Sequence, residues 1–249
     1  DSFVLGGLNI NFAADEFGNN TSIHNRIYNN VLYKNYGPAV TCGGKLYITY
    51  PNLPTYGDNQ FLNNIMYKNA EIPLPGQDGR LPYLDQVAIQ YIDNDGGIGT
   101  SNFSNYNDKW ENNLIEGSDT QNQQILLRGY STVRSTLAQA ESGISGFDVT
   151  FNNNIQGDPL LVNPDSSINS GDLDSVRRNF TLQSGSPCNN AGTHLTTASG
   201  AKTNSNSLQV VDSYWFVGGS NPVNWNGIIP GDTIQVGSEV VQITSIDYD

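Results

Sequence analysis

The sequence has few of the residues that cross-link a chain or ligate a transition metal. Its 249 residues include two cysteines, two histidines and one methionine. Two cysteines as far apart as Cys42 and Cys188 exclude a small domain stapled by disulfides, and we expect both thiols to be free and buried. Because His24 and His194 are the only imidazoles, a zinc site is not expected.

Positive charge is also scarce. Lysine and arginine number 11 against 24 acidic residues, for a formal charge of −13. Nucleic acid is therefore not expected as a partner, because binding to phosphates requires a basic surface. Residues 26–68 differ, since they contain four basic residues and one acid, Asp58, a local charge of +3. Chance clustering and a patch for an anionic ligand both remain open as interpretations.

Long apolar runs are absent as well. No stretch approaches the ~20 apolar residues that a membrane-spanning helix needs. Hydrophobic residues make up only 37% of the chain, but aromatic residues make up 10%, so the chain can fill a core where a disordered sequence could not. No signal peptide is visible and the first residue is Asp1, so we expect a mature product or a trimmed fragment.

An internal repeat dominates the remaining sequence. Residues 27–35 (IYNNVLYKN) align with residues 61–69 (FLNNIMYKN), and fainter copies follow at residues 110–115 (WENNLI) and 151–155 (FNNNI). The shared pattern is an apolar residue, any residue, two asparagines and an apolar residue. Successive copies are offset by 34, 49 and 41 residues, which predicts rungs of one solenoid separated by loops of unequal length.

The asparagine pair has a physical role in such a rung. Tight bends between short strands need a left-handed residue, which asparagine tolerates best after glycine. Stacked asparagine side chains can also hydrogen-bond from rung to rung. We expect the apolar residue after each pair to point into the core and the loops at 51–58 and 72–82 to protrude. The alternative, a β-sandwich with asparagine-rich turns, would show hairpin spacing instead.

Two later segments carry a family resemblance. Residues 157–164 (GDPLLVNP) and 180–192 (FTLQSGSPCNNAG) resemble the closing segment of secreted right-handed parallel β-helix proteins, the pectate-lyase-like superfamily. The resemblance covers residues 23–192. It implies an all-β solenoid over residues 1–195, with a short helix near 132–142, in a secreted or cell-surface protein. For the reaction it implies little, because this fold supports many chemistries.

Beyond residue 195 the sequence changes character. Residues 196–206 are small and polar, as in a linker, and residues 208–211 and 231–236 read as strands. A turn at residues 237–238 and a return strand over 239–247 follow. We expect residues 196–249 to form a small β appendage, cut short. Upstream and downstream solenoid segments, or a capping partner, are expected to cover the solenoid ends.

The basic stretch supplies candidate residues for a polysaccharide lyase. Such an enzyme neutralises a uronate carboxylate with a cation or calcium and removes the neighbouring proton with a base. The candidate catalytic residues are Lys34, Lys45, Arg26 and His24. Lys68 matches Lys34 in the repeat, and tyrosines near the loops could stack on sugar rings, so the candidate substrate-binding residues are Lys68, Tyr47, Tyr50, Tyr56 and Tyr83. Outward, solvated positions for Lys34 and Lys68 are the alternative.

Acidic residues suggest two further possibilities. The segment at residues 93–97 (DNDGG) offers Asp93 and Asp95 as oxygen ligands for calcium, although no downstream bidentate glutamate completes the motif. A plain acidic turn is the alternative. The carboxylate pairs Asp93 with Asp95, or Asp108 with Glu111, could serve a glycosidase if they lay ~5–9.5 Å apart.

The sequence thus predicts a secreted carbohydrate-active solenoid that binds or cleaves an anionic polysaccharide, with a lyase favoured over a hydrolase. A non-catalytic surface, adhesin or fibre-type solenoid is the alternative. The distinguishing feature is whether a base and a carboxylate-neutralising cation converge on one face.

Overall fold

The structure is a computed structural model that describes residues 7–11, 24–35, 37–43, 58–70, 87–91, 107–117, 125–129, 132–134, 136–143, 148–166, 172–200, 205–216, 218 and 231–248. The chain divides into two compact units, residues 1–193 and 194–249. The helices in the described part are short, and neither has the length and apolar character needed to cross a membrane.

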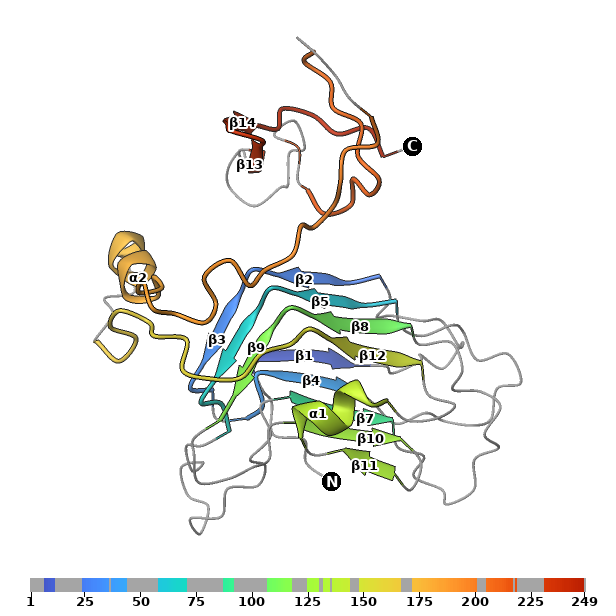
Figure 1. Ribbon diagram of the computed structural model, residues 1–249, viewed down its shortest axis with the longest axis vertical. Coiled ribbons are helices and arrows are strands. Elements are labelled where there is room, and N and C mark those ends of the chain that lie inside the picture. Colours follow the sequence, from blue (N-terminus) through green and yellow to red (C-terminus); the bar gives the residue numbers. More distant parts are fainter. Residues whose placement is uncertain are drawn as a thin grey trace. The chain divides into compact units, whose positions relative to one another are not determined.

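The first unit is a parallel β-solenoid of short strands (Figure 1). One sheet has the order β12-β8-β5-β2, a second β3-β6-β9, and a third β1-β4-β7-β10-β11, with all pairs parallel except β10–β11. The strands are β1 Leu8–Asn11, β2 Arg26–Tyr28, β3 Val31–Tyr33, β4 Val40–Gly43, β5 Gln60–Leu62, β6 Ile65–Tyr67, β7 Val87–Tyr91, β8 Asp108–Glu111, β9 Leu114–Glu116, β10 Ile125–Gly129, β11 Thr132–Arg134 and β12 Val149–Asn152. Each of the first three coils therefore contributes one strand to each sheet.

The register confirms the repeat. Ile27 pairs with Phe61, and Val31 pairs with Ile65, as the 34-residue offset predicts. Phe61 in turn pairs with Trp110, and Trp110 with Phe151. The Phe61 and Trp110 rings stack at 3.6 Å and 8° between planes, and Trp110 and Phe151 at 5.6 Å and 6°. This buried aromatic column is the centre of the core.

Left-handed residues mark the bends, as predicted. In the bend between the β2 and β3 sheets, the first asparagine of every pair is left-handed, with φ of 56° at Asn29, 58° at Asn63, 54° at Asn112 and 52° at Asn153. Residues five positions before these asparagines are left-handed too, at His24, Asp58 and Asn107, and so are residues five positions after them, at Lys34 and Lys68. A two-residue bend after every three-residue strand is what turns the chain into a coil.

The second asparagine of each pair builds a ladder along the solenoid. The side-chain oxygen of Asn64 accepts the backbone N–H and the amide of Asn30, both at 3.1 Å. Asn113 accepts the same two groups from Asn64, and Asn154 accepts them from Asn113. Shorter ladders run from Asn25 through Asn59 to Asp108 and from Asn35 to Asn69. The first asparagine of a pair thus forms the bend, and the second forms the hydrogen-bonded ladder.

The prediction for the residue after each pair is confirmed only in part: Ile65 and Leu114 are buried, whereas Val31 is 37% exposed. Leu32, Met66 and Ile115 pack in the main core, whereas Ile65 and Leu114 belong to a second apolar cluster with Leu182 and Cys188. The left-handed bend rotates the chain, so that the first strand residue after it faces outward. The sequence shows an apolar residue there because the closing segment covers that outer face.

The predicted helix at 132–142 also needs correction. Residues 132–134 are strand β11, antiparallel to β10, and helix α1 spans only Leu137–Glu141. Thr136 caps the helix, accepting from the backbone N–H of Gln139 while the Gln139 side chain accepts from Thr136. This capping box sets the start of the helix four residues later than the predicted range. Leu137 and Ala140 join the core cluster beside β12.

Residues 155–193 form the closing segment over the outer face of the solenoid. Leu161 and Leu182 make an antiparallel bridge, and helix α2, Leu173–Asn179, lies between them in sequence and was not predicted. Asp172 caps α2 by accepting from the Ser175 backbone N–H. Asn63 and Asn112 attach the segment to the solenoid, since their side chains hydrogen-bond the backbone of Thr193 and Ala191.

The second unit contains a small hairpin. Strand β13, Thr233–Val236, pairs antiparallel with β14, Glu239–Gln242, across a turn in which Gly237 has φ of 62°. Ala198 and Val210 form an isolated bridge, and Trp215 is buried. The two-stranded hairpin agrees with the strands and turn predicted near 231–247, although β14 ends at Gln242.

Candidate functional site

One solenoid bend brings a histidine and a carboxylate together. His24 and Asp58 occupy the same left-handed position in successive rungs, with φ of 56° and 54°. The Nδ1 atom of His24 lies 2.6 Å from Oδ2 of Asp58. The other carboxylate oxygen accepts from the amide of Asn107 at 3.1 Å, one rung further on. The stacking of equivalent bends therefore creates a histidine–aspartate pair that local sequence does not show.

The tautomer of His24 follows from its partner. An ionised carboxylate only accepts hydrogen bonds, so Nδ1 carries the proton that it donates to Asp58. In the neutral imidazole the Nε2 atom then has a free lone pair, and Nε2 has no hydrogen-bond partner within the described residues. The His24 side chain is 63% exposed. The pair thus presents an oriented, accessible proton acceptor.

Cations lie on the adjoining outer face. The core positions of this sheet are Ile27, Phe61 and Trp110, and strand residues alternate between faces. The neighbouring row faces outward and comprises Arg26, Gln60, Lys109 and Thr150 in register.

Arg26 adjoins the His24–Asp58 pair directly. Its guanidinium donates to the Asp58 carbonyl at 3.0 Å. Lys109 stands two strands away, about 10 Å at ~4.8 Å per strand. His24, Arg26 and Lys109 therefore lie at the end of the sheet at which its strands begin.

Lys34 and Lys68 lie at a different bend, in the row ten residues after His24. Lys34 Nζ is 2.5 Å from Asp165 Oδ1, which also accepts from the Tyr33 hydroxyl at 2.9 Å. The hydrogen bond to Asp165 raises the pKa of Lys34, and the hydrogen bond to Lys34 lowers the pKa of Asp165. A lysine held protonated in this way is poorly suited to act as a base.

The tyrosines beside these lysines stack along the solenoid. The Tyr33 and Tyr67 rings lie 5.9 Å apart at 27°, and Lys68 Nζ lies 4.8 Å from the Tyr67 ring centre. Burial raises the pKa of both phenols. A hydrogen bond to Tyr67 raises the pKa of Lys68. This cluster fastens the closing segment through Asp165, and two strands and the bend at Asn29 separate it from His24 along the coil.

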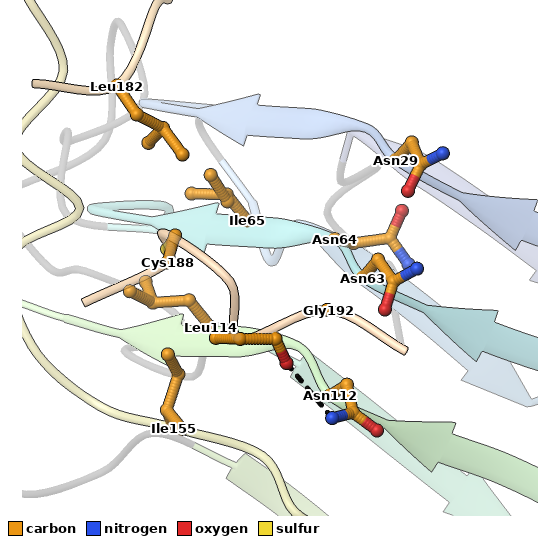
Figure 2. A pocket seen from close by; sticks show the side chains of 11 residues that line it. Asn29, Asn63, Asn64, Ile65, Asn112, Leu114, Ile155, Leu182, Cys188 and Gly192 are labelled. Carbon is orange, nitrogen blue, oxygen red and sulfur yellow. Dashed lines mark hydrogen bonds between the residues drawn. The ribbon is translucent and has the colours of Figure 1, made fainter. Parts of the chain in front are cut away.

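A cavity of about 210 Å³ lies between the solenoid and the closing segment. Figure 2 shows apolar side chains along one side, among them Ile65, Leu114 and Leu182, and asparagine amides along the other. Cys188 lines it as a half-buried free thiol, and burial raises its pKa, as it does for the fully buried Cys42. Neither thiol has the lowered pKa of a nucleophilic cysteine.

Several candidate residues lie outside the described part of the chain: Lys45, Tyr47, Tyr50, Tyr56, Tyr83, Asp93 and Asp95. In the part that is described, no three histidine, cysteine, aspartate or glutamate side chains gather as a metal site. The structure does not bring Asp108 and Glu111 together as a catalytic pair. Asp108 is buried at the end of an asparagine ladder, and Glu111, three residues along the strand, is on the other face.

Sequence reasoning missed the roles of Asp58 and Lys109. Asp58 counted only as the single acid in a basic stretch, although it stands 34 residues after His24, the same offset that relates the first two repeats. Extending the repeat alignment upstream by three residues from residue 27 would have paired them. Lys109 precedes the faint third copy and could have been found in the same way.

Comparisons with protein-family models, with curated proteins and with solved structures found no match. The evidence for the fold is therefore the parallel register, the asparagine ladders and the aromatic column of this chain itself. These features identify a parallel β-solenoid and do not by themselves assign a family.

Proposed function

We propose that this protein is a secreted polysaccharide lyase that binds a uronate-containing chain across the outer face of the β12-β8-β5-β2 sheet. The observation that carries the proposal is the His24–Asp58 pair, with its free Nε2, beside Arg26. A base next to a cation is the combination that β-elimination requires. In a chain of formal charge −13, the outward-facing Arg26 and Lys109 supply local positive charge for a carboxylate.

The reaction assigns one role to each group. Arg26 neutralises the uronate carboxylate, which acidifies the C5 proton. Nε2 of His24 accepts that proton, and Asp58 stabilises the resulting imidazolium through Nδ1. The electron pair of the C5–H bond forms the C4–C5 double bond, and the C4–O bond breaks. The departing oxygen takes the proton from the imidazolium, directly or through a water molecule, so the base is regenerated.

The test is the ultraviolet absorbance of the unsaturated uronate product while the protein is offered a panel of uronate polysaccharides, with and without calcium. A rise in absorbance supports a lyase. His24→Asn should then abolish the rise without disturbing the fold, because asparagine occupies equivalent left-handed bends at Asn29 and Asn63. His194→Asn is the matched control, since His194 is exposed and lies in the second unit.

Asp58→Asn tests the electrostatic part of the argument. Asparagine keeps the left-handed bend and can still hydrogen-bond Nδ1, but it removes the charge that stabilises the imidazolium. We expect kcat to fall by about 10²–10⁴, the range of a general-base contribution, with KM changed much less. Full activity in both His24→Asn and Asp58→Asn would refute the assigned roles.

A non-catalytic structural solenoid is the second candidate, and one observation favours it. The longest ladder, from Asn30 to Asn154, continues through four rungs without interruption, and the aromatic column continues through three, as suits a rigid rod. No product with any uronate polymer, from a folded protein, would favour this role over catalysis.

A further inference from the structure

The cavity under the closing segment has a lining that no step of the proposed reaction uses. Its floor consists of Ile65 and Leu114, which are buried, with Ile155, Leu182 and Cys188 around them. Its opposite side consists of the amides of Asn29, Asn63 and Asn112 (Figure 2). The apolar side of the cavity can contact a methyl group, and the amide side can hydrogen-bond an amide. A ligand with a methyl group bonded directly to an amide would fit both sides.

The amides are not equivalent. Asn63 exchanges hydrogen bonds with the backbone of Thr193, donating at 2.9 Å and accepting at 2.8 Å. Asn112 donates to the carbonyl of Ala191 at 3.0 Å. Asn29 occupies the same position one rung earlier, yet within the described residues its side chain has no hydrogen-bond partner. The row therefore holds the closing segment with two amides and leaves a third for a ligand.

We infer that this cavity binds the acetamido group of an N-acetylated sugar. The methyl group packs on the half-buried side chains of Ile155 and Leu182, and the amide of the ligand pairs with the amide of Asn29. At about 210 Å³, the cavity has room for an acetamido group and part of the attached ring. The inference rests on the proposal that the ligand is a saccharide, and it names N-acetylhexosamine as part of that ligand.

The geometry also relates the cavity to the proposed lyase face. Asn29, Asn63 and Asn112 follow β2, β5 and β8 directly, while His24 and Asp58 precede β2 and β5. The two bend rows thus flank the same sheet, one on each side. A polymer lying on this sheet could place a uronate at the His24 edge and an acetamido group at the other edge.

Saturation-transfer difference NMR on the full chain tests the inference, with N-acetylglucosamine, N-acetylgalactosamine and glucose as probes. We expect the acetyl methyl protons to receive the strongest saturation and glucose to receive little. Asn29→Gly removes the free amide and keeps the left-handed bend. It should weaken binding by about two- to tenfold, the worth of one hydrogen bond. Ala191→Leu should weaken binding further by filling the cavity.

Asn153→Gly is the matched control. Asn153 occupies the same kind of bend, with φ of 52°, but it does not line the cavity, so binding should be unchanged. The inference is overturned if the acetyl methyl is not favoured, if the control weakens binding as much as Asn29→Gly does, or if Ala191→Leu has no effect. His24→Asn should leave acetyl saturation intact, so failure of the lyase assay and failure of this site are distinguishable.

Discussion

Replacing Asn113 by alanine should destabilise the solenoid more than any exposed substitution. Asn113 is fully buried, and its side chain makes four hydrogen bonds. It accepts the backbone N–H and the amide of Asn64, and it donates to the Phe61 carbonyl and to Asn154, each at 2.9 Å. Truncation leaves three buried groups without this partner: the Asn64 backbone N–H, one Asn64 amide N–H and the Phe61 carbonyl.

The expected loss follows from those orphaned groups. At about 1–3 kcal/mol per buried group left without a partner, reduced by local relaxation, the free energy of unfolding should fall by about 3–6 kcal/mol. That is a large share of the ~5–15 kcal/mol of a typical domain. Urea unfolding followed by circular dichroism measures the change. Asn152→Ala, an exposed position on β12, is the control and should stay within about 0.5 kcal/mol.

A second variant separates hydrogen bonding from volume. Leucine has nearly the shape of asparagine but neither donates nor accepts, so Asn113→Leu should be destabilised about as much as Asn113→Ala. If leucine restores stability, the ladder contributes only by filling space, and the reasoning is refuted. A loss in Asn113→Ala no larger than in Asn152→Ala would refute it as well.

Three further predictions follow from the bends, the core and the closing segment. Asn153→Val should lower the free energy of unfolding by about 1–2 kcal/mol, because a β-branched residue is strained at φ of 52°, whereas Asn153→Gly should be nearly neutral in the same urea titration. Trp110→Ala should remove about 3–5 kcal/mol, because it opens the aromatic column between two stacked rings, and the loss should appear in thermal unfolding. The contact of Asp165 with Lys34 and Tyr33 should be pH-dependent: the pKa of Asp165 is lowered in the folded state, so the contact stabilises above the usual carboxyl pKa and is lost as pH falls through the lowered value. Hydrogen exchange in the closing segment should rise in that acidic range, and Asp165→Asn should remove the pH dependence; exchange that is flat in the native protein would contradict the assignment.

The repeat made the register of the solenoid predictable. Because Ile27 and Phe61 align at a constant offset, both the pairing of β2 with β5 and the stacking of the second asparagines follow. Sequence alone could not place Ile65, because an apolar residue looks the same in sequence whether it enters the main core or lies under a covering segment. The residues that cover Ile65, among them Ile155, Leu182 and Cys188, follow it by 90 positions or more.

The candidate site was predictable in part for the same reason. His24 and Arg26 were identified by residue type, and the structure brings both onto Asp58. Lys34 was also chosen as a candidate residue by its type. Its partner Asp165 comes from the closing segment, and no repeat relates the two. Contacts between equivalent rung positions can be read from an offset, whereas contacts between the solenoid and the segment that covers it need three-dimensional information.

The direction of the ladders explains where this acidic chain places a carboxylate against its asparagine ladders. Every rung donates its backbone N–H and amide to the next rung, so an inner member must both accept and donate. The last member needs only to accept, and a carboxylate does that well. Asp108 ends one ladder, and Glu141 of α1 accepts the backbone N–H of Asn154 at the end of another. Aspartate is therefore tolerated where asparagine stacking stops, and at Asn113 it would leave the Phe61 carbonyl without a donor while burying a charge.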